Sequence, residues 1–384
     1  MEGQRNQGES VGVHRAQPRS GPARRRVSDM PRLVRPRAKI QLQSIGTFQL
    51  DEYIHAVMFS PDGSRLAVVD ASGQVAVWHV GSRRRVFRNT KHQGAVLAEG
   101  WHPGGKILAT AGEDGVGRVW DVGSGEERAV VPVGDGKGWV EHLAWESGGE
   151  RLAMTAGKTL QILKWSESGG CSVEWETSDH KSSVSDLCWR KGYPGQIFSS
   201  CFGGVTLWQV GMDSPVNTFP YDGALLSLSI SSNGQYLAAG NLDGSVHLWS
   251  LSTGQNWHMA GYPCKVGHVV FDPYGEFLWT AAGPDLVAWS AQKFEGSSGR
   301  LLSSHLGWIQ AIACHPRQRV VATVGEDGLL CLWEPGKAKP RVSQELRVSR
   351  GLSCVAWSPT DVCLAVGADD GTVALFAVEG MGEK

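Results

Sequence analysis

The feature that most constrains this chain is an aromatic-ended apolar strand that recurs along its whole length. Eight such strands end in Trp78, Trp120, Trp165, Trp208, Trp249, Trp289, Trp333 and Phe376. Neighbouring aromatics are 40 to 45 residues apart. A unit of that size cannot bury its apolar face alone, so successive units must stack against one another. The spacing therefore predicts one large repeat domain built from small sheets.

Each unit contains three strand-like segments joined by tight glycine turns. The first unit reads HAVMFSPDG, then RLAVVD, then QVAVWHV, and the second follows the same order. Turns such as Pro-Asp-Gly and Glu-Asp-Gly suit hairpins, because glycine readily adopts the positive φ that these turns require. The fifty glycines and sixteen tryptophans agree with many short strands.

Two units carry four polar and aromatic residues at matching positions. The sets are His92, Thr110, Asp114 and Trp120, and His305, Thr323, Asp327 and Trp333. With these residues the chain resembles the WD40 repeat family over residues 40–378. The resemblance implies a buried hydrogen-bonded tetrad in each of these two blades. In it the Asp accepts the imidazole proton and the hydroxyl links the ring to the indole N–H.

Other units depart from the tetrad pattern. The Trp-Asp dipeptide itself occurs only at Trp120-Asp121, and Ala239 replaces the hydroxyl residue in the fifth unit. The third, fourth and sixth units lack the turn Asp in register. We therefore expect those three blades to be less fully hydrogen-bonded and to depend on packing.

The number of strands favours eight blades. Seven units are followed by a plausible outer strand, whereas the eighth ends six residues after Val378. The segment KIQLQSIGTFQL at 39–50 can supply the missing strand, and closure removes free sheet edges. We expect an all-β, closed WD40-type β-propeller of eight blades whose N-terminal strand closes the last blade. Seven blades, the commoner number in the family, is the alternative.

The N-terminal region differs in charge from the rest of the chain. Residues 1–39 carry ten Arg or Lys and three acidic residues, whereas the whole chain has a net charge of −1. We predict a basic, disordered tail at 1–38 and a propeller domain at 39–384. The tail could contact nucleic acid, and Arg24–Arg26 could be a nuclear signal. A start at Met30 is a further possibility, in which most of the tail would be missing.

The cysteines and the hydropathy pattern indicate an intracellular protein. None of the eight cysteines forms a C-x-x-C pair, and most lie in apolar strand-like runs. No apolar stretch of about 18 residues and no signal region is present. We expect a cytoplasmic location, with the nucleus as the alternative, and no membrane contact.

Motifs for catalysis, cofactors or metals are weak. Two glycine-rich stretches, 112–117 and 134–138, lie between strands without a following helix, so they do not fit a phosphate loop. His55, His142 and His268 stand near first strands but show no metal-ligand spacing. We expect no enzyme activity, no cofactor, no metal and no small-molecule substrate. The enzymatic or metal-handling alternative needs His or carboxylate side chains converging in the central channel.

The resemblance places two sets of residues on the narrow top face of the ring. The predicted partner-binding residues are Tyr53, Trp139, Lys265 and Trp308 at first-strand entries, and Glu113, Glu326 and Asp369 before the hairpin turns. Aromatic residues on loops are typical binding hot spots. We expect a protein-binding scaffold that holds a basic, partly apolar peptide. Alternatively, the aromatics pack on neighbouring loops and the acids are only solvated.

Overall fold

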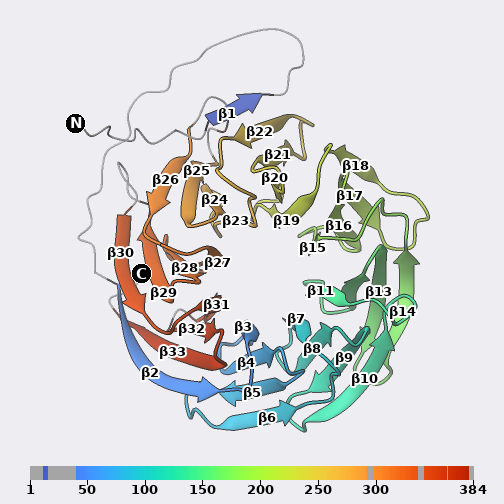
Figure 1. Cartoon of the computed structure of the whole chain (residues 1–384). Helices are drawn as coiled ribbons and strands as arrows, with labels where there is room; N and C mark the ends of the chain where they lie inside the picture. The colour runs from blue at the N-terminus through green and yellow to red at the C-terminus, as the bar shows by residue number, and fades with distance from the viewer. Residues whose placement is uncertain are drawn as a thin grey trace.

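The computed structural model describes residues 12–15, 40–291, 294, 298–335, 341–360 and 362–379. In this part of the chain all regular structure is β, and eight sheets of at least four strands surround a common centre (Figure 1). The eight-bladed propeller predicted from the sequence is confirmed. The described residues include no helix that is long and apolar enough to cross a membrane.

The first four blades follow one another along the chain, each with four strands ordered from the centre outward. Blade 1 is β3 (Ile54–Phe59), β4 (Arg65–Asp70), β5 (Val75–His79) and β6 (Arg85–Asn89). Blade 2 is β7 (Val96–Trp101), β8 (Ile107–Gly112), β9 (Val116–Asp121) and β10 (Glu126–Pro132). Blade 3 is β11 (Val140–Trp145), β12 (Arg151–Ala156), β13 (Thr159–Ser166) and β14 (Gly170–Thr177). Blade 4 is β15 (Asp186–Trp189), β16 (Gln196–Cys201), β17 (Gly204–Gln209) and β18 (Asn217–Pro220).

The last four blades complete the ring. Blade 5 is β19 (Leu225–Ile230), β20 (Tyr236–Asn241), β21 (Val246–Ser250) and β22 (Asn256–Ala260). Blade 6 is β23 (His268–Phe271), β24 (Phe277–Ala282), β25 (Asp285–Ser290) and β26 (Arg300–Ser303). Blade 7 is β27 (Ile309–Cys314), β28 (Val321–Gly325), β29 (Leu329–Glu334) and β30 (Arg341–Arg347). Blade 8 is β31 (Leu352–Trp357), β32 (Cys363–Ala368), β33 (Thr372–Glu379) and β2 (Gln41–Gln49).

The N-terminal strand closes the ring. β2 pairs antiparallel with β33 from Gln41 opposite Glu379 to Gln49 opposite Thr372. The prediction that residues near 39–50 supply the outer strand of the last blade is therefore confirmed. Closure joins the two ends of the propeller by main-chain hydrogen bonds, so blade 8 resists opening as a normal sheet does.

The core lies between neighbouring blades, where both faces of each sheet are covered. The tryptophans of the third strands are buried there, and Trp120 and Trp289 are fully buried. Four first-strand tryptophans donate their indole N–H to a carbonyl of the preceding blade. These bonds are Trp101 to Met58 (3.1 Å), Trp145 to Gly100 (3.0 Å), Trp189 to Ala144 (2.9 Å) and Trp357 to Ala313 (3.0 Å). Packing and hydrogen bonding thus fix each blade to the next.

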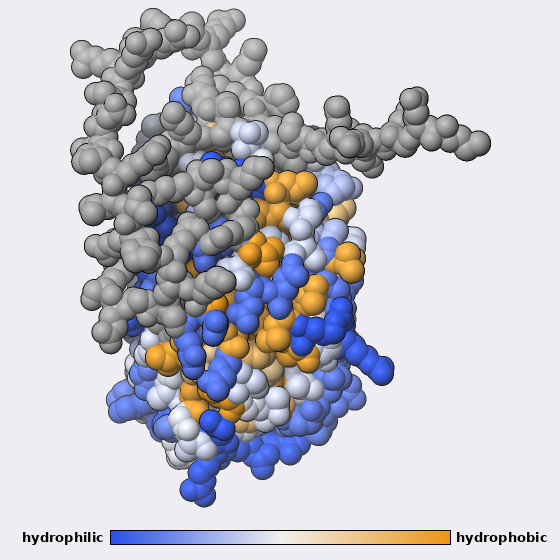
Figure 2. All heavy atoms as spheres, turned by 90° about the vertical axis from the view of Figure 1, so that its left-hand side faces the viewer, coloured by the Kyte–Doolittle hydropathy of each residue, from blue (hydrophilic) through white to orange (hydrophobic). Residues whose placement is uncertain are grey.

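The outer strands form the wall of the ring and are half exposed. β10 alternates exposed and partly buried residues along its length. Figure 2 shows the side of the molecule near β30 and β2, where hydrophilic and hydrophobic residues are interspersed. All eight cysteines are free thiols, and four of them are buried.

One strand comes from the predicted tail. β1 (Gly12–Arg15) pairs antiparallel with β22 and makes blade 5 a five-stranded sheet (Figure 1). The remaining residues of 1–39 lie outside the described part. The division into a disordered tail and a propeller domain therefore stays a prediction.

Candidate protein-binding surface on the top face

The two complete tetrads fix the hairpins that form the top face. In blade 2 the Nε2 atom of His92 lies 2.8 Å from the Thr110 hydroxyl, which also accepts the Trp120 indole N–H at 2.8 Å. His92 Nδ1 lies 3.0 Å from an Asp114 oxygen. Because the indole can only donate, the hydroxyl must donate to Nε2, and Nδ1 therefore carries the proton bound by Asp114.

The ring electrostatics agree with this arrangement. Burial lowers the pKa of His92, and the hydrogen bond and charge of Asp114 only partly oppose this effect. The neutral imidazole is the form that can accept from the hydroxyl and donate to the carboxylate. Blade 7 has the same geometry, with distances of 2.8 Å from His305 to Thr323 and 2.7 Å from Trp333 to Thr323. Asp327 lies 3.1 Å from His305 Nδ1.

Blades 4 and 6 build equivalent relays from other residues. In blade 4, His180 lies 2.7 Å from the Ser199 hydroxyl, which accepts from Trp208 at 2.8 Å. His180 Nδ1 lies 2.8 Å from the carbonyl oxygen of Lys158 instead of an Asp. In blade 6 a tyrosine replaces the histidine. Its contacts are Tyr262 to Thr280 at 2.7 Å and Trp289 to Tyr262 at 2.8 Å.

The prediction of poorer hydrogen bonding is therefore wrong for blades 4 and 6. The physical reason is that the relay needs an acceptor and a hydroxyl, and a backbone carbonyl or a phenol can fill these roles. In blade 3 the prediction agrees with the structure, because the buried Thr155 hydroxyl has no hydrogen-bond partner.

Three of the predicted partner-binding residues line one cavity. We define the top face as the side where the inner strands begin and where the hairpins between second and third strands turn. A cavity of about 560 Å³ opens there and is lined by Lys265, Trp308 and Glu326 from blades 6 and 7. Trp308 is 43% exposed, and the Lys265 ammonium lies 5.4 Å from its ring centroid. Gln310 donates to Glu326 at 2.8 Å and orients this carboxylate.

Two further predicted residues, Tyr53 and Asp369, stand on blades 1 and 8 and do not line this cavity. Burial raises the pKa of Tyr53, a hydrogen bond with Ser353 lowers it, and the charges of Asp369 and Glu326 raise it further.

The remaining two predicted residues lie apart from that cavity. Trp139 stands on blade 3 and is 56% exposed, but it does not line the cavity. Glu113 accepts the backbone N–H of Ala95 at 3.1 Å, so part of its hydrogen-bonding capacity serves its own blade.

The sequence reasoning missed two apolar side chains on the top face. Phe202 and Leu242 are 51% and 56% exposed, and they occupy the hairpin position that Glu113, Glu326 and Asp369 occupy in other blades. Reading this position in every unit would have found them. We call Trp139, Phe202 and Leu242, on blades 3 to 5, the apolar sector.

The inner strands bring no metal-binding group together. Among the residues that the structure describes, no three His, Cys, Asp or Glu side chains lie close enough to hold an ion. Burial lowers the pKa of both His142 and His268 to about 4, so both rings are neutral near pH 7. Burial raises the pKa of Glu99 to about 8, and neither of its carboxyl oxygens has a partner.

Comparison with family models gives matches in both halves of the chain. The model described as "WD domain, G-beta repeat" matches residues 213–250, 296–334 and 343–376. A model described as "Anaphase-promoting complex subunit 4 WD40 domain" matches residues 57–148. Together these matches include residues of blades 1 to 3 and of blades 5 to 8.

Relatives and solved structures are similar at low sequence identity. Nuclear distribution protein nudF of Aspergillus niger is 22% identical over 315 residues, which are 74% of this chain and 69% of that protein. WD repeat-containing protein 1 of Gallus gallus is 22% identical over 342 residues, which are 86% of this chain and 48% of that protein. Protein HIR1 of Mycosarcoma maydis is 22% identical over 359 residues, 84% of this chain and 32% of that protein.

The chain thus spans less than half the length of the last two relatives. The computationally designed Ika8 protein superposes with a TM-score of 0.72 at 20% identity, covering 86% of this chain and 97% of that one. This likeness concerns the fold alone.

Proposed function

The chain belongs to the WD40 repeat family, and we propose that it is a protein-binding scaffold whose top face holds a basic segment of a partner protein. One of the two matching family models is named for a subunit of a multiprotein complex, which supports a scaffold role. The proposed binding site is the cavity at Trp308 together with the carboxylates of Glu326 and Asp369.

The observation that carries this proposal is the arrangement of Lys265, Trp308 and Glu326 around one cavity. An ammonium already lies over the indole ring of Trp308 at 5.4 Å, with a carboxylate lining the same space. A cation over an aromatic ring gains electrostatic energy, and tryptophan is common at binding hot spots. An Arg or Lys of a partner would displace Lys265 from the ring and pair with Glu326.

A peptide selection tests this proposal directly. A phage-displayed library of random 12-residue peptides is panned on the full chain, and recovered peptides are synthesised for titration. We expect sequences rich in Arg and Lys with an adjacent apolar residue. The double variant Glu326→Lys with Asp369→Lys should abolish their binding, and Trp308→Ala should weaken it by about tenfold or more.

Trp139→Ala is the matched control, because this tryptophan is also exposed, at 56% against 43% for Trp308, but lies outside the cavity. Recovery of neutral or acidic peptides, or unchanged binding after the double charge reversal, would refute the proposal. Tight binding of single-stranded RNA that weakens steeply with salt and is lost on deleting 1–38 would instead support the nucleic-acid alternative. The cytoplasmic location, with the nucleus as the alternative, remains a prediction for fluorescence microscopy.

A further inference from the structure

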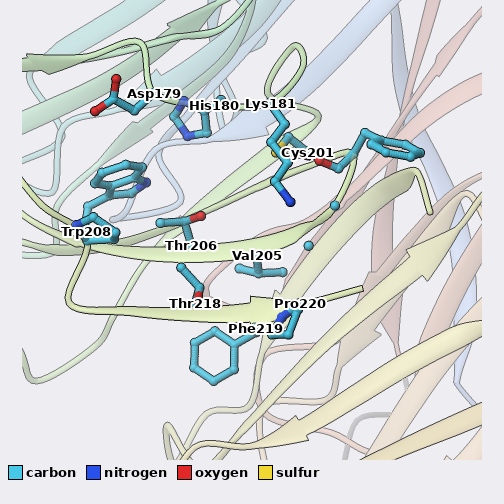
Figure 3. A pocket seen from close by; sticks show the side chains of 14 residues that line it. Asp179, His180, Lys181, Cys201, Val205, Thr206, Trp208, Thr218, Phe219 and Pro220 are labelled. Carbon is cyan, nitrogen blue, oxygen red and sulfur yellow. Dashed lines mark hydrogen bonds between the residues drawn. The ribbon is translucent and has the colours of Figure 1, made fainter. Parts of the chain in front are cut away.

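A second cavity lies in blade 4, away from the proposed peptide site. It measures about 430 Å³ and is formed entirely by residues between Asp179 and Pro220. Figure 3 shows Thr206, Thr218 and Trp208 on one side of it and the side chain of Lys181 extending into it from the opposite loop. Phe202 of the apolar sector also lines it. A cavity of this size can accept a side chain or a small group.

In blades 2 and 7 a glutamate of the outer strand accepts a hydrogen bond from the residue that precedes the tetrad histidine. Glu127 of blade 2 accepts from Lys91 at 2.5 Å and from Arg118 at 2.6 Å. Glu345 of blade 7 accepts from the Ser304 hydroxyl. Lys91 and Ser304 each immediately precede the tetrad histidine of their blade. Both blades therefore have a carboxylate that accepts a hydrogen bond from the residue before the tetrad histidine; Glu127 is largely covered, whereas Glu345 is exposed.

Blade 4 lacks that carboxylate. In the strand register of blade 7, Glu345 lies opposite Cys331, two residues before the blade tryptophan. In blade 4 the equivalent position places Thr218 opposite Thr206. A threonine thus stands where blade 7 has its glutamate, and Thr206 stands where blade 2 has Arg118. The turn acid is missing as well. Four residues after the relay hydroxyl, blade 4 has Gly203 with a φ of +98°, a conformation that disfavours other residues.

The cavity retains unused hydrogen-bond donors. Both ring nitrogens of His180 are engaged by Lys158 and Ser199. Among the described residues, none forms a hydrogen bond or ion pair with the Lys181 ammonium or with the hydroxyls of Thr206 and Thr218. One cation and two hydroxyls therefore line the cavity, and no acceptor among the described residues binds them.

We propose that the blade 4 cavity binds a carboxylate of a peptide partner, in the role that Glu127 and Glu345 play within blades 2 and 7. Lys181 supplies the charge, Thr206 and Thr218 supply hydroxyl donors, and Trp208 and Phe202 pack against the apolar neighbour of the acidic residue. This second site has the opposite charge preference to the Trp308 cavity, and it does not depend on the function proposed for that cavity.

The negative charge of Asp179 should lower the affinity of the cavity for a carboxylate, which gives a prediction of opposite direction to that for Lys181. It replaces Lys91 and Ser304 at the position before the histidine, and it lies on the other side of His180 from Lys181 (Figure 3). A like charge near the site reduces the affinity for a carboxylate. Removing Asp179 should therefore strengthen the binding that removing Lys181 weakens.

The test is an NMR titration of the full chain with three pentapeptides, following the amides of Gly203 and Thr206. The first peptide is blocked at both ends and has a central glutamate flanked by leucines. The second has glutamine instead, and the third is the glutamine peptide with a free C-terminus. We expect saturable shifts with the first and none with the second. Shifts with the third would show that a chain terminus also supplies the carboxylate.

Four variants complete the test. Lys181→Met should weaken binding of the glutamate peptide by about tenfold, and Asp179→Asn should strengthen it by about threefold. Thr218→Glu gives blade 4 the glutamate that blade 7 has at this ladder position and should abolish binding, whereas Thr218→Gln, of equal size, should retain it. Equal binding of the glutamate and glutamine peptides, or unchanged binding by the Thr218→Glu variant, would overturn the proposal. The double variant at Glu326 and Asp369 should bind this peptide normally, which separates the two sites.

Discussion

Blade 2 and blade 4 hold their tryptophans by the same hydrogen-bond relay, although only the histidine and the tryptophan are identical. Thr110 and Ser199 each accept an indole N–H at 2.8 Å and contact a histidine ring. The acceptor on the far side of the ring is Asp114 in one blade and the Lys158 carbonyl in the other. The comparison shows that the relay requires a hydroxyl at its centre but no particular acceptor at its end.

The two blades differ in where their remaining polar groups lie. In blade 2, Arg118 and Glu127 pair with each other and are largely covered. Blade 4 has a cavity beside its relay instead. The inner strands differ too, because Glu99 stands two residues before Trp101 where blade 4 has Leu187. The other blades also have aliphatic residues at this position: Val57, Leu143, Leu228, Val269, Ile312 and Val355. Blade 2 thus satisfies or buries its charges internally, whereas blade 4 leaves donors open.

The largest effect is expected from removing the central hydroxyl. Thr110→Val leaves the Trp120 indole N–H and the Nε2 atom of His92 without partners in a buried setting, which should lower the free energy of unfolding by about 3–4 kcal/mol. Ser199→Ala should cost a similar amount if the two relays are equivalent. Urea unfolding followed by tryptophan fluorescence measures both. A loss well under 1 kcal/mol for Ser199→Ala alone would break the comparison.

The next effect concerns the buried Glu99 and has the opposite sign. Its pKa is raised from 4.5 to about 8 by burial. Below pH 4.5 both states are protonated and no penalty exists. Between pH 4.5 and about 8 only the unfolded state ionises, so stability falls by about 1.4 kcal/mol per pH unit and then levels off.

The variant Glu99→Leu gives blade 2 the residue of blade 4 and should remove this pH dependence. We expect a gain of about 3 kcal/mol at pH 7 and little change at pH 4. Urea unfolding at a series of pH values checks it. A gain of equal size at pH 4 would show that packing, not ionisation, is responsible.

A smaller effect should follow when blade 2 receives the threonine of blade 4. Arg118→Thr removes the contacts to Glu127 and Asp114 but leaves Lys91 beside Glu127. Because the pair is mostly covered by protein, we expect a loss of about 1–2 kcal/mol, between the values typical of exposed and buried ion pairs. Differential scanning calorimetry provides the measurement, with Arg128→Thr on the exposed surface as the control.

The smallest effect is expected at the residue before the histidine. Lys91 is half exposed and contacts Glu127 and the Trp120 ring. Lys91→Met should cost at most about 0.5 kcal/mol, and this cost should vanish in 1 M salt because exposed charges are screened. Asp179→Asn in blade 4 should leave stability unchanged. A salt-independent loss for Lys91→Met would mean that its aliphatic stem, not its charge, supports blade 2.

The sequence predicted the repeat, the eight blades and the closing strand, because these depend on local patterns. Turn glycines and alternating apolar residues mark each strand, and the segment at 41–49 remained as the single strand without a unit. The substituted relays could not be predicted in this way. Lys158 contributes a carbonyl, which every residue has, and Tyr262 replaces a histidine that the pattern required.

The candidate sites, too, were predicted only in part from the sequence. The top-face positions of Trp308, Glu326 and Asp369 follow from their places in the repeat, but whether they share a cavity depends on neighbouring blades. Phe202, Leu242 and the blade 4 cavity were missed, and the cavity depends on how side chains of several segments pack. Nothing in the sequence at Thr206 or Thr218 shows that these residues line a cavity together with Lys181.

The sequence by itself therefore determined the architecture, because the period and the turn chemistry are short-range and repeat eight times. Only the tertiary structure decided which polar groups are satisfied. Glu99, Lys181 and Glu326 are all simply charged residues in the sequence. In the structure Glu99 is buried without a partner, Lys181 lines a cavity and Glu326 is oriented by Gln310. Burial and pairing arise between blades, from residues far apart in the chain, and electrostatic energy depends on that environment more than on residue type.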